Sequence, residues 1–147
     1  MMMKLITIGR DKMEIMREIE EDYKIAKSED CLKYIEGIRN LDREHFVVLG
    51  LDTQNKVTYR EIAHIGTLNS CIIHPREIFK KAILMGCHSI ITVHNHPAGS
   101  IEPSEEDKML SNNIRDAGEI LGIKLLDSLI ITKNKLESYI QPKMTFD

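Results

Sequence analysis

Apolar residues change their spacing along the chain, and each change predicts a different kind of element. In the first segment they recur at helical spacing, at Met16, Ile19, Tyr23 and Ala26. This pattern predicts an amphipathic helix from Asp11, preceded by a short edge strand at Leu5 to Ile8. Ser28 is expected to cap a second helix. Residues 1–27 are therefore expected to form a helical appendage, and residues 28–147 a single domain.

Continuous apolar runs occupy the middle of the chain, as they do in strands that are buried on both faces. The run from Glu44 to Leu51 predicts a central strand, and Val57 to Ile65 predicts its hairpin partner. Pro75 opens a helical pattern after this hairpin. β-branched residues then fill Ser89 to Val93, which predicts a third strand.

A long helical pattern begins at Ser104 and stops at Gly122. Further strand segments are expected after it, at 123–126 and 129–132. Because a helix separates the hairpin from the third strand, the order of the elements predicts an α/β fold whose ligand site lies at strand ends.

The side chains with the most useful chemistry stand at the end of the third predicted strand. His94 and His96 are two residues apart, so both rings lie on one side of an extended chain, which a helix would not allow. Asp107 falls in the first turn of the helix that opens at Ser104, beside that strand end. Two imidazoles and one carboxylate leave the fourth position of a tetrahedral zinc ion open, as in catalytic rather than structural zinc sites.

The spacing of these residues matches a known motif. His94-x-His96, seven residues, Ser104, two residues and Asp107 resembles the JAMM motif of the MPN-plus, or JAB, metalloproteases. The wording His-Asn-His-Pro, with Pro-Ser after it, is similar to the RadC-like branch of that family. The flanking stretches that also resemble this branch are Gly66-Thr67-Leu68-Asn69, His74-Pro75-Arg76-Glu77 and Leu121-Gly122-Ile123 with Leu126-Asp127. The resemblance runs from about Ser28 to about Tyr139.

This resemblance implies a JAB/MPN-type domain, which is a mixed central sheet flanked by helices in a cytidine-deaminase-like architecture. It also implies a zinc ion held by His94, His96 and Asp107. Zinc lowers the pKa of a bound water from about 15.7 to about 7. The resemblance assigns Glu44 as the base that takes a proton from this water, and Ser104 as a hydrogen-bond donor to the developing oxyanion. The implied reaction is hydrolysis of a peptide or isopeptide bond in a peptide or protein substrate.

Two of these residues have simpler interpretations from the sequence alone. Glu44 is equally well explained as a solvated carboxylate at the edge of the sheet, and Glu61 on the next strand is a second candidate for the base. Ser104 is well explained as a helix N-cap, followed by carboxylates that the helix dipole favours in the first turn. The resemblance favours the catalytic roles because every position of the motif is filled.

The chain departs from the usual RadC-like pattern at two positions. Ala98 stands where these proteins usually have Ser, and Ser128 stands where a His usually follows the Asp of the late strand. Neither position is a metal ligand, so the departures concern the substrate loop and the support of the ligands. Full-length RadC proteins carry a helix-hairpin-helix segment before this domain. Because about 28 residues precede the match, we expect a short form without that segment.

The net charge of the chain bears on whether the protein binds nucleic acid. The 147 residues include 20 Lys plus Arg against 23 Asp plus Glu, which gives a net charge of −3. Proteins that bind nucleic acid usually carry a basic stripe or domain. The alternative function, a DNA-repair-associated accessory protein as the RadC name suggests, therefore has no support from charge.

The lengths of the apolar runs and the positions of the cysteines indicate in which cellular compartment the protein works. No run in the sequence approaches the ~18 residues of a membrane span, and the first residues do not resemble a signal peptide. The three cysteines form no C-x-x-C pair, so they are expected to be buried small hydrophobic residues. We expect a cytoplasmic protein without a membrane partner.

Overall fold

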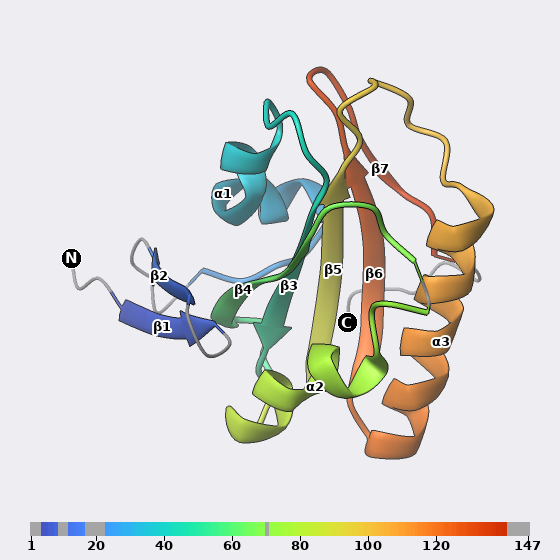
Figure 1. Ribbon diagram of the computed structural model, residues 1–147. Coiled ribbons are helices and arrows are strands. Elements are labelled where there is room, and N and C mark those ends of the chain that lie inside the picture. The colour runs from blue at the N-terminus through green and yellow to red at the C-terminus, as the bar shows by residue number, and fades with distance from the viewer. Residues whose placement is uncertain (1–3, 9–11, 17–22, 70, 141–147) are drawn as a thin grey trace.

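The computed structural model describes residues 4–8, 12–16, 23–69 and 71–140 of the chain. Its centre is a five-stranded sheet with the strand order β4-β3-β5-β6-β7 (Figure 1). The strands are β3 (His45–Leu51), β4 (Val57–Ile65), β5 (Ser89–Asn95), β6 (Lys124–Ile131) and β7 (Leu136–Ser138). β5 and β6 are parallel and the other neighbours are antiparallel, so the sheet is mixed, as the resemblance implied.

Helices cover both faces of this sheet (Figure 1). The helical elements are η1 (Ser28–Cys31), α1 (Leu32–Ile35), η2 (Glu36–Ile38), α2 (Pro75–Leu84) and α3 (Glu105–Leu121). Phe79 of α2 and Leu110 of α3 are buried in one core cluster with Phe46 of β3. Ile35 of α1 is buried in a second cluster with Leu49 of the same strand. Because neighbouring residues of β3 feed opposite clusters, the strand is buried on both faces, and the predicted α/β fold is confirmed.

No helix in the described part of the chain has both the length and the apolar character that crossing a bilayer requires.

The prediction of an N-terminal helix is wrong for the residues that the structure describes. β1 (Lys4–Ile8) and β2 (Lys12–Met16) pair as antiparallel strands, so the strand expected at Leu5 to Ile8 is confirmed but the helix from Asp11 is not. Residues 12–15 alternate polar and apolar, a period of two that suits a strand. Residues 17–22 lie outside the described residues.

The chain is also extended where it enters the sheet region. Lys24 forms an isolated β-bridge with Lys56, and the Ile25 N–H donates to the Asn55 carbonyl at 2.9 Å. Ile25 is buried in the second core cluster. The helical appendage is thus replaced by extended chain wherever residues 4–27 are described, while a domain boundary near residue 28 stays a prediction.

Ser28 begins the second helical segment instead of capping it. Lys27 occupies the N-cap position, and the Asp30 carboxylate accepts the backbone N–H groups of Ala26 and Lys27 at 2.8 and 3.0 Å. The Ser28 hydroxyl is therefore free for another partner, and it donates to Asp127 Oδ2 at 2.9 Å.

That contact explains why β6 is a single strand where the sequence predicted two segments. Asp127 and Ser128 are buried in the middle of β6. Buried polar side chains almost always have hydrogen-bond partners. Asp127 accepts from Ser28, from the Ser138 hydroxyl and from the Ser128 N–H. These three donors allow the strand to continue through a buried carboxylate.

Gly50 of β3 is expected to tolerate no side chain. A Cβ there would lie 2.0 Å from Cε1 of the buried Tyr59 ring and 2.8 Å from the Cys87 sulfur. We expect Gly50→Ala to reduce the free energy of unfolding by ~1–3 kcal/mol, as overpacking does. Urea denaturation would measure this. Gly37→Ala is the matched control because nothing lies within 4 Å of its Cβ position, and equal midpoints for the two variants would contradict the prediction.

Candidate metal centre

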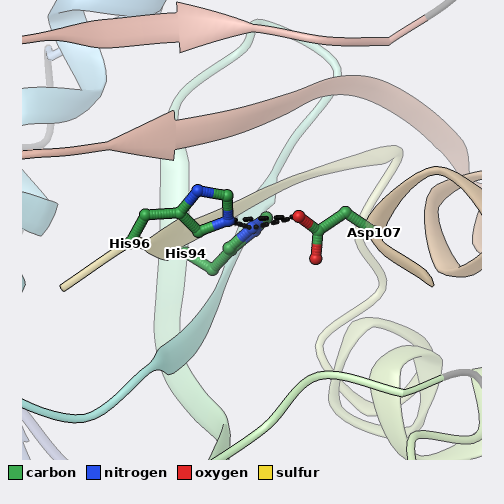
Figure 2. A group of neighbouring side chains, drawn as sticks. All are labelled: His94, His96 and Asp107. Carbon is green, nitrogen blue, oxygen red and sulfur yellow. Dashed lines mark hydrogen bonds and ion pairs between the residues drawn. The ribbon is translucent and has the colours of Figure 1, made fainter. Parts of the chain in front are cut away.

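Strand β5, the residue that follows it and helix α3 bring the predicted ligands together at one end of the sheet (Figure 2). His94 belongs to β5, His96 lies one residue past the end of that strand, and Asp107 lies in the first turn of α3. Figure 2 shows one carboxylate oxygen of Asp107 directed at both imidazole rings. The three side chains that the sequence spacing predicted to lie together are therefore neighbours in the structure.

The distances within this triad are short. The Nε2 atoms of His94 and His96 are 3.0 Å apart, and Asp107 Oδ2 lies 3.4 and 3.1 Å from them. His94 and Asp107 are nearly inaccessible to solvent, at 1% and 3% exposure, whereas His96 is 12% exposed. Two ring nitrogens and a carboxylate oxygen that converge in this way form a donor set suited to a metal ion, with access from the side of His96.

The ring of His96 is oriented for metal binding. Its Nδ1 lies 2.8 Å from the Ser100 carbonyl oxygen, which accepts hydrogen bonds and cannot donate them. Nδ1 must therefore carry a proton, so Nε2 is the ring nitrogen that is directed at the centre and that the neutral ring would offer to a metal ion. A backbone carbonyl that fixes the tautomer in this way is a common second contact of metal-binding histidines.

His94 is held by ring contacts. Its imidazole stacks on Phe46 at a centroid distance of 6.1 Å, and Tyr139 meets it edge-on at 5.7 Å. Its Nδ1 is buried without a hydrogen-bond partner. Apart from the contacts of its Nε2 atom within the triad, packing therefore fixes the direction in which this side chain points.

Asp107 is part of a capping box at the start of α3. The Ser104 N–H donates to Asp107 Oδ2 at 2.9 Å, and the Asp107 N–H donates to Ser104 Oγ at 3.0 Å. Burial raises the pKa of Asp107, but hydrogen bonds from His94 and His96 outweigh it and hold that pKa well below its usual range. The bond to Asp107 raises the pKa of His96 in turn. The carboxylate is thus ionised and fixed in place.

Ser104 is confirmed as the N-cap of α3. Its hydroxyl oxygen accepts from Asp107, which leaves the hydroxyl proton for a second partner. Its role as an oxyanion donor stays a prediction.

The two candidate bases occupy different surroundings. Glu44 directly precedes β3, and its Oε1 lies 3.9 Å from His96 Nε2, with 26% of the side chain exposed. Glu61 lies within β4, two residues from the buried Tyr59 and so on the same face of the strand, and Tyr59 belongs to the core cluster that includes Phe79 of α2. Glu61 therefore faces α2. Glu44 is the carboxylate that the fold brings to the triad, and its role as base stays a prediction.

The description of the family model that matches residues 25–144 is RadC-like JAB domain. This chain belongs to the RadC-like JAB domain family. The wider JAB-domain family includes metallohydrolases, and a candidate metal site formed by His94, His96 and Asp107 accords with that relationship.

Curated relatives of this RadC-like chain carry the name UPF0758 protein, which states no activity. One from Desulforamulus reducens is 52% identical over 108 residues, which is 74% of this chain and 48% of that protein. One from Bacillus cereus strain B4264 is 42% identical over 138 residues, or 93% of this chain and 60% of that protein. One from Chlorobium chlorochromatii is 45% identical over 117 residues, or 79% and 53%. The chain thus spans about half to three fifths of these relatives.

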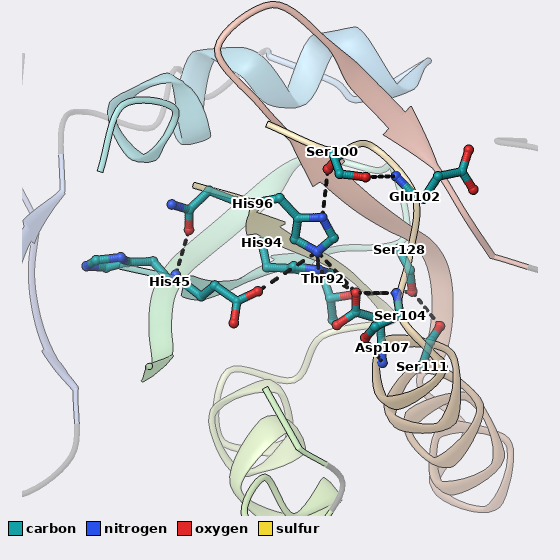
Figure 3. Close-up of polar contacts among 12 residues, drawn as sticks. His45, Thr92, His94, His96, Ser100, Glu102, Ser104, Asp107, Ser111 and Ser128 are labelled. Carbon is teal, nitrogen blue, oxygen red and sulfur yellow. Dashed lines mark hydrogen bonds and ion pairs between the residues drawn. The ribbon is translucent and has the colours of Figure 1, made fainter. Parts of the chain in front are cut away.

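The two departures from the RadC-like pattern lie outside the triad, and Figure 3 shows one of them, Ser128, close to Asp107 and the start of α3. Ser128 belongs to a buried hydroxyl network: it accepts from Thr92 at 3.3 Å and lies 2.8 Å from the Ser111 hydroxyl. Ala98 lines a cavity that adjoins His96. Ser128 therefore serves the packing of β5, β6 and α3 and makes no described contact with a ligand.

Sequence reasoning missed one polar residue of this RadC-like centre. Asn95 is fully buried, and its side chain hydrogen-bonds the segment that carries Glu44. The available signal was its place between two histidines on a strand, since alternation sends its side chain to the opposite face of the sheet from theirs.

Proposed function

We propose that the protein is a zinc-dependent hydrolase that cleaves peptide or isopeptide bonds. The observation that carries this proposal is the convergence of two Nε2 atoms and one carboxylate oxygen at the end of β5, with Glu44 beside them. Membership of the RadC-like JAB family supports the same assignment.

Zinc fits this donor set better than magnesium or calcium does. Magnesium and calcium prefer shells made of oxygen atoms, whereas two imidazoles and one carboxylate suit zinc. When bound, the ion supplies a Lewis acid and a water with a lowered pKa. His94, His96 and Asp107 would hold it.

Glu44 and Ser104 handle the proton and the developing charge in this proposal. A Glu44 carboxylate oxygen takes a proton from the attacking water and passes it to the nitrogen of the leaving amine. The Ser104 hydroxyl donates a hydrogen bond to the carbonyl oxygen of the scissile bond as negative charge grows there. Neither residue is a metal ligand, so each can be replaced without removing the ion.

A cavity borders the centre on the side of His96. It has a volume of about 560 Å³, adjoins His96, and is lined by residues 39–42, 97–99 and 132–134. This volume is in the range of small-molecule and side-chain pockets. We propose that the chain next to the scissile bond lies in this cavity.

We also propose that the protein works in the cytoplasm. All three cysteines are free thiols, which fits a reducing compartment. Cys31 and Cys87 are buried as expected, but Cys71 is exposed.

Peptide cleavage tests the proposed function. The zinc-loaded chain should hydrolyse members of a mixed-sequence library of internally quenched fluorogenic peptides or isopeptides. Treatment with a zinc chelator should abolish the signal, and added zinc should restore it. Cleavage that persists at full rate after complete removal of the metal would contradict the proposal.

DNA affinity is expected to be weak and strongly dependent on salt. The 20 basic residues are outnumbered by 23 acidic ones, so few phosphate charges can be neutralised. Fluorescence anisotropy with a labelled duplex, at two salt concentrations, measures this. Tight, sequence-specific binding near physiological salt would contradict the prediction and favour the DNA-repair function.

A further inference from the structure

Asn95 follows one metal-ligand histidine and precedes the other, yet its side chain makes a separate set of contacts. Strand residues alternate sides, so its carboxamide lies opposite the two imidazole rings. Its exposed fraction is 0%, so its polar atoms need partners within the protein. Those partners belong to one short segment, residues 41–45.

The hydrogen bonds of Asn95 flank Glu44 on both sides along the chain. Asn95 Oδ1 accepts from the His45 N–H at 2.6 Å, and Nδ2 donates to the Arg43 carbonyl at 2.9 Å. Nδ2 also lies 3.3 Å from the Leu41 carbonyl. From the other side, the Gly66 N–H donates to the Glu44 carbonyl at 2.8 Å. The two peptide groups that flank the Glu44 Cα atom, 43–44 and 44–45, are therefore both anchored.

The hydrogen bonds of Asn95 hold residues 43–45 where the backbone pairing of β3 with β5 has already ended. The register between β3 and β5 ends at the pair Phe46 and His94, so Glu44 lies beyond the paired residues of the two strands. A carboxamide offers both a donor and an acceptor, which the carbonyl of Arg43 and the N–H of His45 require together. An ionised carboxylate offers acceptors alone, and an aliphatic side chain offers neither.

We propose that Asn95 is a positioning residue, which fixes the backbone of Glu44 so that its carboxylate stays beside His96. The inference rests on the proposed function, in which Glu44 moves the proton. Glu44 Oε1 lies 3.9 Å from His96 Nε2, and its side chain is partly exposed. Without the anchor, the carboxylate is free to turn into solvent. The tripeptide 94–96 thus carries two metal ligands and the support of the base.

Two variants and one control test this role. Asn95→Ala removes the whole anchor, whereas Asn95→Asp keeps the side-chain size and the acceptor for His45 but loses the donors. Thr92→Val is the matched control, since Thr92 is buried in the same strand and donates to Ser128. If Asn95→Ala does not fold, Asn95→Asp decides the question.

Hydrogen exchange gives a readout that needs no substrate. In the zinc-loaded full chain, Asn95→Ala should speed exchange of the His45 amide by about tenfold, the effect of losing one ordinary hydrogen bond. Zinc content and the protection of β6 should match those of the wild type. Unchanged exchange at His45, loosening of the whole sheet, or loss of zinc would each overturn the proposal.

Kinetics with the quenched peptides separates positioning from simple stability. Asn95→Ala and Asn95→Asp should lower kcat by ~10–100-fold, as removal of supporting contacts does elsewhere, with little change in KM. Thr92→Val should match the wild type. In a Glu44→Gln background the Asn95 change should cost nothing further, because the residues act as one unit.

The two levels of the proposal fail in different ways. Full turnover in Glu44→Gln would overturn the proposed role of Glu44 and with it the inference. An inactive Glu44→Gln beside a fully active Asn95→Ala would overturn the inference alone. The inference would also be overturned if the Asn95→Ala change lowered kcat in the Glu44→Gln background by the same factor as in the wild type.

Discussion

A protein that carries Glu44→Gln is expected to keep its zinc and to cleave peptides ~10²–10⁴-fold more slowly than the wild type. The amide has nearly the same shape as the carboxylate but cannot accept the proton. Glu44 lies 3.9 Å from His96 and is not a member of the candidate ligand set, so the metal should stay bound. Steady-state rates and zinc content, measured on the same sample, check both parts.

Glu61→Gln is the matched control for this substitution. It makes the same chemical change on a carboxylate that lies on β4 and faces α2. Its turnover should equal that of the wild type. If Glu44→Gln is fully active and Glu61→Gln is not, the base has been assigned to the wrong residue.

Replacing both histidines of the triad, in His94→Ala with His96→Ala, should remove stoichiometric zinc and with it all activity. One carboxylate alone cannot hold zinc in a site of this kind, and removal of mere supporting contacts already weakens metal binding ~10–100-fold. Equilibrium dialysis against zinc, followed by metal analysis, gives the occupancy.

The control for that variant replaces two histidines elsewhere. His74 and His88 are exposed and lie outside the triad, so the His74→Ala, His88→Ala protein should bind zinc like the wild type. Zinc that persists at full occupancy without His94 and His96 would refute the ligand assignment. Because His94 packs against Phe46, circular dichroism must show that the double variant is folded.

The sequence predicted best those features that depend on neighbouring residues. The spacing of His94 and His96 needs one strand end, and Ser104 with Asp107 needs one helix turn, so local geometry suffices for both. The hairpin of β3 and β4 was likewise predictable from the apolar run of β3 and from the short turn that separates it from the next strand-like segment.

The features that were mispredicted depend on partners far along the chain. β6 passes through Asp127 because Ser28, 99 residues earlier, donates to it. β2 is a strand because β1 pairs with it, although its apolar residues also continue into a helical spacing. Local periodicity carries no information about such partners, so it favoured two short strands and a helix.

The placement of Glu44 shows the same limit within the site. Its sequence position before an apolar strand fits a solvated edge and a catalytic base equally well. The choice depends on the pairing of β3 with β5, which sets Phe46 opposite His94 and so brings Glu44 close to His96. Long-range register, and not local pattern, decides which carboxylate reaches the candidate metal ligands.

Zinc content of the purified chain, measured beside that of Asp107→Ala, tests the central claim most directly. After dialysis against zinc and removal of the excess, the wild type should hold about one zinc per chain, and Asp107→Ala should hold almost none. Glu106→Ala, which removes an exposed carboxylate from the same helix turn, should keep the wild-type value. Equal zinc in the wild type and in a folded Asp107→Ala protein, or a wild type that binds no zinc, would contradict the assignment of a zinc centre to His94, His96 and Asp107.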